Sequence, residues 1–277
     1  MKTSTFLNIK GGVAKTSTTE ILGHILTEKF KKKVLLIDAD PQGNLSKMYG
    51  NLPIMEIVIK ALQKQPDPME GCITLADLLR NRNMDVHEAI QCTPYEGMDI
   101  IPALLSLANA ETFMKADISH AQQFNLKKHL EKVDGEYDYC LIDCSPSVNL
   151  VNLNALVASD KVYIPMKVDS NSILGMCTAE DIIQDAREFN PSLIYGGCFF
   201  TQYDARKKIS DNAKELVEEF RKEELLPVII RQSKLVEEMS WYKSPLLEYD
   251  PKVKGEYSTV TKEYLKLAEI ITDGECK

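Results

Sequence analysis

Basic residues are in short supply in this 277-residue chain: 33 lysines and arginines stand against 41 aspartates and glutamates, a formal net charge of −8. That balance excludes a uniformly basic DNA-coating protein, so any contact with nucleic acid must come from a local patch. Glycine and proline are also scarce, at 13 and 12 residues, while 44% of the residues are hydrophobic. Collagen-like and disordered chains need a far more skewed composition, so the chain is expected to fold.

Long apolar runs and paired cysteines are missing as well. No stretch approaches the roughly 18 consecutive apolar residues of a membrane span, and the N-terminus lacks the apolar core of a signal peptide. The cysteines show neither a C-x-x-C pair nor zinc-ligand spacing; they are Cys72, Cys92, Cys140, Cys144, Cys177, Cys198 and Cys276. We therefore expect reduced thiols in a cytoplasmic protein with no stable membrane binding.

Short apolar runs alternate with helical patterns, a rhythm typical of a parallel sheet with helices on both faces. The predicted strands cover residues 4–9, 33–38, 98–101, 139–143, 161–165, 194–201 and 228–230. The clearest helices cover 16–30, 173–189, 211–222 and 258–271, whereas about 45–80 is less regular and predicts helices joined by loops. No repeat or Gly/Ser linker divides the chain. The prediction is one α/β domain over residues 1–277, with a mostly parallel twisted sheet of about seven to eight strands.

The first predicted strand leads through a glycine turn into a helix. The turn and the start of the helix read Lys10, Gly11, Gly12, Val13, Ala14, Lys15, Thr16 and Ser17. Glycine backbone can approach phosphate oxygens closely, and the N–H groups of a first helical turn point at an anion with the helix dipole behind them. In such a phosphate cradle Lys15 would reach the β- and γ-phosphates of ATP, and the Thr16 hydroxyl would bind Mg²⁺ directly.

Carboxylates follow two other predicted strands. Asp38 and Asp40 stand at the end of the second strand, and Asp143 stands at the tip of the strand over 139–143. Ligands of open α/β sheets bind at the carboxyl ends of the strands. Beside a Mg²⁺-nucleotide, Asp38 and Asp40 would organise metal-bound water and the attacking water, and Asp143 would hold a water on Mg²⁺.

The loop departs from the general P-loop pattern but resembles a specific variant of it, K-G-G-x-x-K-[ST], the deviant Walker A motif of the ParA/MinD family of ATPases. The resemblance implies an ATP-bound homodimer in which Lys10 crosses the interface to the phosphates of the partner's nucleotide. Ala14 stands where the family usually has glycine, and we expect its methyl to be tolerated if the φ of this residue is negative. The segment D-x-D-P-Q-G-N resembles a second family motif, which assigns Asp40 to positioning the hydrolytic water, and Asp143-Cys144-Ser145-Pro146 resembles the Walker B region.

The C-terminal third resembles ParA/Soj partition ATPases in three segments, which begin at Thr201, Ile229 and Pro245. Two departures are Ile230 in place of proline and Val253-Lys254 in place of a serine. The resemblance implies that Thr201 and Arg231 contact the nucleotide. It also implies non-specific double-stranded DNA binding by the dimer, nucleoid association in the ATP form, and a ParB-type partner that stimulates hydrolysis. Only three residues precede the first predicted strand, so we expect no N-terminal helix-turn-helix domain. The implied DNA-binding residues are Arg206, Lys207, Arg231 and Lys234.

Two other classes share the phosphate loop. A MinD-like membrane switch requires a basic amphipathic C-terminal helix, whereas the tail after Ile271 is short and acidic, and the stripe of the helix over 258–271 is expected to face the sheet. A metabolic ATP-dependent ligase of the dethiobiotin synthetase type would need neither Lys10 in trans nor the basic patch. An iron–sulfur member is disfavoured because no cysteine pair has the spacing to share a cluster between subunits.

Overall fold

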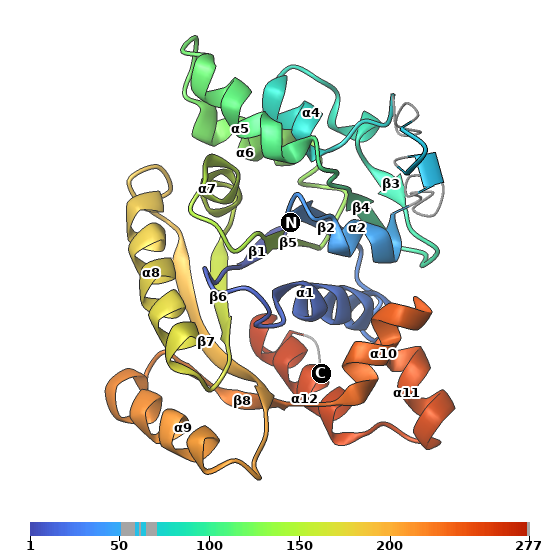
Figure 1. Ribbon diagram of the computed structural model, residues 1–277. Coiled ribbons are helices and arrows are strands. Elements are labelled where there is room, and N and C mark those ends of the chain that lie inside the picture. The colour runs from blue at the N-terminus through green and yellow to red at the C-terminus, as the bar shows by residue number, and fades with distance from the viewer. Residues whose placement is uncertain (51–58, 61, 65–70, 276–277) are drawn as a thin grey trace.

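A computed structural model describes residues 1–50, 59–60, 62–64 and 71–275 (Figure 1). Eight strands in these residues form one sheet in the order β3-β4-β2-β5-β1-β6-β7-β8. The β3–β4 pair is antiparallel and every other pair is parallel. The strands are β1 (Lys2–Phe6), β2 (Val34–Ala39), β3 (Gln91–Cys92), β4 (Met98–Ile101), β5 (Tyr139–Cys144), β6 (Lys161–Met166), β7 (Ile194–Tyr203) and β8 (Leu225–Arg231).

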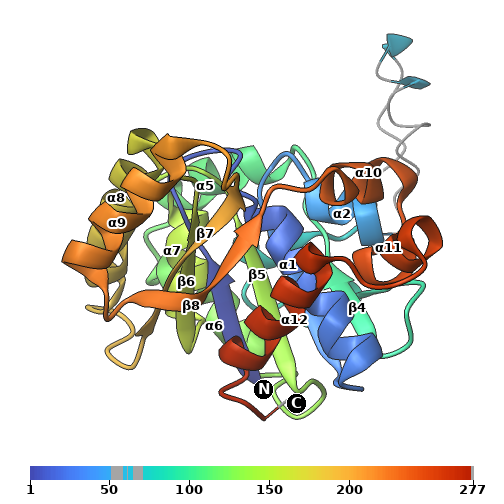
Figure 2. The ribbon, with the colours of Figure 1, turned by 90° about the horizontal axis from the view of Figure 1, so that it is seen from below.

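Helices cover both faces of this sheet (Figures 1 and 2). One face carries α4 (Leu75–Arg80), α5 (Leu107–Ala116), α6 (Asn125–Leu130), α7 (Leu150–Val157), α8 (Ser170–Ala186) and α9 (Lys208–Arg221). The other carries α1 (Lys15–His24), α2 (Asn44–Tyr49), α10 (Lys234–Tyr242), α11 (Leu246–Lys254) and α12 (Thr259–Ile271). Each face has its own apolar cluster, so the predicted α/β sheet with helices on both sides is confirmed.

The central strands are buried along their whole length because both of their faces are covered. All six residues of β2 are buried, as are all six of β5. The parallel register places Asp38 beside Asp143, and it places Phe6 at the end of β1 beside Asp143 as well. The three strands therefore end together at one edge, and the loops that follow them converge there.

The predicted strands are present with shifted bounds. β1 ends at Phe6 instead of Ile9, because the chain turns away at Asn8, whose side chain bonds the loop backbone. The helix predicted over 16–30 is α-helical only to His24 and continues as a π-helical turn over Ile25–Lys29. The two-residue strand β3 gave no sequence signal. Of the irregular helical segment predicted over about 45–80, α2 and α4 lie at its ends, while 51–58, 61 and 65–70 lie outside the described residues.

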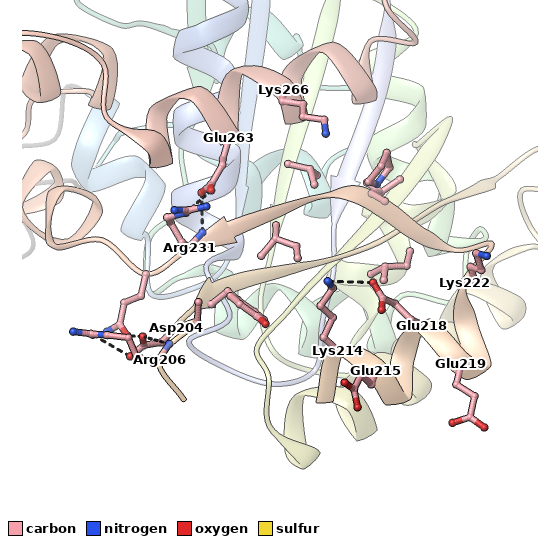
Figure 3. Close-up of a pocket in the computed structure, with 18 residues that line it drawn as sticks. Asp204, Arg206, Lys214, Glu215, Glu218, Glu219, Lys222, Arg231, Glu263 and Lys266 are labelled. Atoms are coloured by element: carbon pink, nitrogen blue, oxygen red, sulfur yellow. Dashed lines mark hydrogen bonds and ion pairs between the residues drawn. The ribbon is translucent and has the colours of Figure 1, made fainter. Parts of the chain in front are cut away.

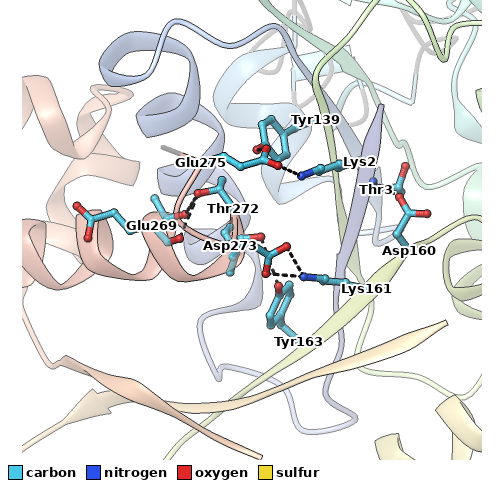
Figure 4. A network of polar contacts seen from close by, with 12 residues as sticks. Lys2, Thr3, Tyr139, Asp160, Lys161, Tyr163, Glu269, Thr272, Asp273 and Glu275 are labelled. Carbon is cyan, nitrogen blue, oxygen red and sulfur yellow. Dashed lines mark hydrogen bonds and ion pairs between the residues drawn. The ribbon is translucent and has the colours of Figure 1, made fainter. Parts of the chain in front are cut away.

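The apolar stripe of α12 faces the core as expected. Val260, Tyr264, Leu267, Ala268 and Ile271 are all buried. The residues after the helix are tied to the strand starts at the opposite edge of the sheet from the phosphate loop (Figure 4). Asp273 pairs with Lys161 of β6 at 2.7 Å, and Glu275 bonds Lys2 and the Tyr139 hydroxyl. Among the described residues, no helix combines the length and apolarity that crossing a membrane requires.

Asp250, part of a segment that resembles the partition ATPases, performs a structural task at the turn between α11 and α12. The carboxylate is fully buried and accepts the backbone N–H and the hydroxyl of Ser258, both at 2.7 Å, and the hydroxyl of Thr261. Because a buried carboxylate is costly without such donors, these bonds join the two helices and cap the start of α12.

Candidate nucleotide site

The loop between β1 and α1 is anchored by a buried asparagine. Asn8 is fully buried; its Nδ2 donates to the carbonyl of Pro165 at the end of β6 (2.9 Å), and its Oδ1 accepts the backbone N–H of Lys10 (2.8 Å). A methyl group at Gly175 of α8 would lie 2.5 Å from this Oδ1. The loop is therefore held in shape between β6 and α8 before any nucleotide arrives.

Lys15 points back into the loop that it follows. Its buried ammonium donates to the carbonyls of Asn8 (2.9 Å) and Lys10 (3.2 Å). Burial lowers the pKa of this ammonium, and the negative charge of Asp143 opposes that shift. A lysine inside a loop with glycines at its rim is placed to bind phosphate oxygens, as the sequence predicts for Lys15.

Two residues of β7 support the loop from behind. The Thr201 hydroxyl is fully buried and bonds the carbonyls of Val13 (3.0 Å) and Met166 (3.3 Å). The Gln202 side chain donates to the carbonyl of Gly12 at 3.1 Å. Thr201, predicted to touch the nucleotide, is thus seen holding the loop backbone. The support from Gln202 had no sequence signal, because it depends on how β7 lies against the loop.

Ala14 adopts a left-handed backbone conformation. The residue has φ +64° and ψ +29°, so the condition under which its methyl is expected to be tolerated, a negative φ, is not met. Gly12, two residues earlier, also has a positive φ of +72°. The left-handed conformation costs an L-residue roughly 1–2 kcal/mol, because its Cβ crowds the following carbonyl oxygen. The turn into α1 imposes this geometry, and the chain accommodates an alanine there under strain.

The predicted carboxylates meet at the ends of β2 and β5. Asp38 is fully buried and accepts the N–H (2.8 Å) and the hydroxyl (2.7 Å) of Ser46 and the N–H of Asp40 (3.1 Å). Burial raises the pKa of Asp38 to about 6, and its hydrogen bonds oppose the rise. Asp40 itself is half-buried beyond the end of the strand, with one oxygen accepting the N–H of Gln42 at 2.9 Å.

Asp143 is the least satisfied group of the site. Both of its carboxylate oxygens are buried and neither has a hydrogen-bond partner among the described residues. Burial and the neighbouring charge of Asp38 raise its pKa well above the ordinary value, while Thr16 and Lys15 lower it. An added cation would relieve this excess of negative potential, so the carboxylates and the half-buried Thr16 fit a Mg²⁺ ion held by oxygen ligands and waters.

Glu20 is a further buried carboxyl that the sequence reading passed over. It lies on α1, one turn beyond Thr16, and its Oε1 has no hydrogen-bond partner among the described residues. Burial, followed by the charge of Asp143, raises the pKa of Glu20 to about 8. Glu20 therefore holds a proton at neutral pH. Its position in a helical stripe could have drawn attention to it, since acidic residues are rarely buried.

Most of the predicted DNA-binding residues are paired with acids, and Figure 3 shows two of them, Arg206 and Arg231. Arg206 is held by Asp204 at 2.9 Å, and Lys207 lies 3.8 Å from the same carboxylate. Arg231 is held by Glu263, at 2.5 Å from its Nε and 2.9 Å from its backbone N–H. Lys234 is exposed at the start of α10 and forms no ion pair with another described residue.

A groove runs along β8 between α9 and α12, and Arg206 and Arg231 line it. Its charged lining is balanced in sign: Arg206, Lys214, Lys222, Arg231 and Lys266 face Asp204, Glu215, Glu218, Glu219 and Glu263 (Figure 3). The groove is therefore not a basic trough. Lys234 is the most available of the predicted DNA contacts.

Comparison with known sequences identifies the class of protein. Residues 1–194 match the family model described as an AAA domain. The chain is 33% identical over 269 residues to the sporulation initiation inhibitor protein Soj of Bacillus subtilis, covering 96% of this chain and 97% of Soj. It is 32% identical over 271 residues to the chromosome partitioning protein ParA of Caulobacter vibrioides, covering 97% and 92%.

Solved structures agree in fold. McdA of Cyanothece superposes with a TM-score of 0.77 at 23% identity, over 97% of this chain and 99% of that one. Cobyrinic acid a,c-diamide synthase of Mycobacterium smegmatis, solved with an ATP analogue and magnesium, has a TM-score of 0.73 at 27% identity, over 100% and 98%. Fold and site together define a P-loop ATPase with an AAA domain. Within that class the chain belongs to the ParA/Soj family, and its resemblance to that family is confirmed.

The left-handed Ala14 predicts that Ala14→Gly stabilises the nucleotide-free protein. Removing the Cβ relieves a strain of roughly 1–2 kcal/mol. The greater freedom of glycine in the unfolded chain opposes this gain by about 0.5–1 kcal/mol. Urea denaturation should show a net increase in the free energy of unfolding of up to about 1.5 kcal/mol. Ala213→Gly, inside α9, is the control and should destabilise. Equal losses in both variants would contradict the strain at Ala14.

The buried Glu20 predicts a pH dependence of stability. The folded protein holds this proton more tightly than the unfolded chain, so the free energy of unfolding falls as the pH rises from about 4.5 to about 8. In Glu20→Gln that contribution is absent. Denaturation should be measured across this pH range. The free energy of unfolding of the variant should rise relative to that of the wild type as the pH increases. The control Glu219→Gln, at an exposed position, should show the same pH dependence of the free energy of unfolding as the wild type. The same pH dependence in Glu20→Gln would contradict the raised pKa of Glu20.

Proposed function

We propose that this ATPase partitions DNA: two Mg-ATP-bound copies join face to face, and the dimer binds double-stranded DNA without sequence preference. A ParB-type partner stimulates hydrolysis and releases the protein. The observation that carries the proposal is the position of Lys10. This lysine is exposed at the rim of the phosphate loop, and its ammonium has no partner among the described residues of its own subunit. The ParA and Soj relatives, named for chromosome partitioning or for sporulation control, support the same assignment.

The backbone of Lys10 is fixed while its side chain stays free. Its N–H bonds Asn8 and its carbonyl accepts the ammonium of Lys15, so the position of the Cα is set by the loop. An exposed cation on a fixed base suits a contact with a second molecule. Placed at the phosphates of a partner's nucleotide, it would act as an arginine finger does, an effect worth about 10³–10⁵ in rate.

Exposed apolar side chains surround the same edge of the sheet. Leu105 follows β4, Val148 follows β5, and Leu174 stands in the first turn of α8 after β6; their exposed fractions are 72%, 67% and 64%. Because β4, β5 and β6 run parallel, their following loops lie at the edge that carries the phosphate loop. Apolar surface around a nucleotide site supports docking of a second copy face to face.

Each residue of the proposed site has a separate role in ATP hydrolysis. Lys15 and the N–H groups of residues 11–17 hold the phosphates, and Thr16 with Asp143 and Asp38 would hold Mg²⁺, the latter two through water. When bound, Mg²⁺ neutralises charge on the β- and γ-phosphates. Asp40, whose exposed side lies beyond β2, orients the attacking water, and Lys10 of the partner completes the site. Hydrolysis then depends on dimerisation.

A metabolic ATP-dependent enzyme is the second candidate, favoured by the likeness to cobyrinic acid a,c-diamide synthase. Such an enzyme would be indifferent to DNA. A membrane switch is disfavoured by α12, whose apolar stripe is buried and whose end is tied to β1, β5 and β6. DNA binding is therefore the property that separates the proposal from its alternative.

The free ammonium of Lys234 predicts a loss of DNA binding in Lys234→Glu. With ATP, the wild type should bind duplex DNA, and with ADP it should not. The variant loses one phosphate contact per subunit, so the dimer's salt dependence should become less steep by about 1.8 in log–log slope. Binding to a labelled duplex, measured by fluorescence anisotropy across a salt series, gives both the affinity and the slope.

The matched control is Lys128→Glu, the same charge change on the exposed face of α6. It should bind DNA like the wild type, and both variants should bind ATP normally. DNA binding by neither wild type nor control would refute the partition function and favour the metabolic alternative. Equal weakening in both variants would instead point to net charge alone.

A further inference from the structure

We propose that Lys167 is a phosphate-binding residue of the ATP site, contributed in cis from the loop that follows β6. Its Nζ lies 3.8 Å from the position that a Cβ on Gly12 would occupy, and no other atom outside residues 11–13 comes within 4 Å of that position among the described residues. The ammonium therefore lies over the exposed glycine of the phosphate loop. The inference rests on ATP binding by the family to which the chain belongs, and not on the proposed DNA partition.

The order of the strands brings Lys167 to this place. β1 lies between β5 and β6, so the loops after β5 and β6 flank the phosphate loop on its two sides. Pro146, after β5, lies 3.9 Å from a Cβ position on Gly11, and Lys167, the first residue after β6, lies over Gly12. The bond between Asn8 and the Pro165 carbonyl ties the end of β6 to the loop, so the Cα of Lys167 is held close to it.

Nothing in the described chain neutralises this lysine. It is half-buried, and no carboxylate among the described residues lies within ion-pair distance of it. The acid nearest in sequence, Asp169, is engaged elsewhere: its two oxygens accept the N–H (2.9 Å) and the hydroxyl (3.0 Å) of Ser172 at the start of α8. A half-buried ammonium without a counter-charge is available to pair with an anion.

The surroundings define the anion. A loop with exposed glycine backbone, with Lys15 inside it and Lys167 over it, suits the phosphate chain of a nucleotide. Lys167 differs from Lys15 in where it approaches. Lys15 enters from within the loop, bonded to Asn8 and Lys10, whereas Lys167 approaches over Gly12 from the neighbouring strand. The two cations would contact the phosphate chain from different directions.

The test is equilibrium binding of fluorescent ATP, ADP and AMP derivatives to the purified protein, together with the melting temperature of the nucleotide-free protein. Lys167→Ala should bind ATP about tenfold more weakly, the loss of one charge-assisted hydrogen bond. Lys167→Arg should keep most of the affinity. Lys128→Ala, an exposed lysine on α6, is the control and should bind like the wild type.

The outcomes separate the contact from a structural role. A loss confined to ATP would assign Lys167 to the γ-phosphate, and an equal loss for ATP and ADP with AMP unchanged would assign it to the β-phosphate; either supports the proposal. Wild-type affinity for all three nucleotides in Lys167→Ala would overturn it. So would a uniform loss that includes AMP and comes with a lower melting temperature, because that result describes a misfolded loop. DNA is absent from the assay, so failure here is independent of the partition function.

Discussion

The repulsion between two buried carboxylates is the constraint around which this site is organised. The register of β2 and β5 sets Asp38 beside Asp143, and the coverage of both sheet faces removes them from water. Burial raises the pKa of both groups, and the charge of Asp38 raises that of Asp143 further. Among the described residues, hydrogen-bond donors reach the carboxylate of Asp38 but not that of Asp143. The fold thus leaves a strong local preference for cations at the mouth of the phosphate loop. Lys15 neutralises part of the negative charge of these carboxylates, and Mg²⁺ bound with ATP would neutralise the rest.

Sequence reasoning succeeded where the chemistry depends on strand ends. Parallel strands with apolar runs place their following residues at one edge, so Lys15, Asp38 and Asp143 could be brought together from their positions along the chain. It could not reach features that depend on backbone geometry or on a neighbour distant in sequence. The positive φ of Ala14 arises from the turn into α1, the role of Thr201 from the position of β7 behind the loop, and the proximity of Lys167 to Gly12 from strand order. None of these has a local signal.

The structure shows where part of the chain's excess of acidic residues lies: beside predicted DNA-binding arginines. Asp204 and Glu263 hold Arg206 and Arg231, so these two predicted DNA-binding residues carry their own counter-charges. Under the proposed function, a single copy would bind a polyanion weakly. Two copies joined by ATP would double the number of available cations, of which Lys234 has the fewest competing contacts, and separation after hydrolysis would favour release.

The central claim is that Lys10 completes the site of the partner subunit, and complementation between two inactive chains tests it most directly. Lys10→Ala and Asp40→Ala chains are each expected to bind ATP and to hydrolyse little of it. In a mixed dimer, the subunit with Lys10→Ala keeps its own Asp40 and receives Lys10 from the other chain, so one site is intact. The account predicts that mixing the two before adding ATP restores a measurable part of the ATPase rate. A mixture as inactive as its components, although both bind ATP and dimerise, would show that Lys10 acts within its own subunit and would contradict the account.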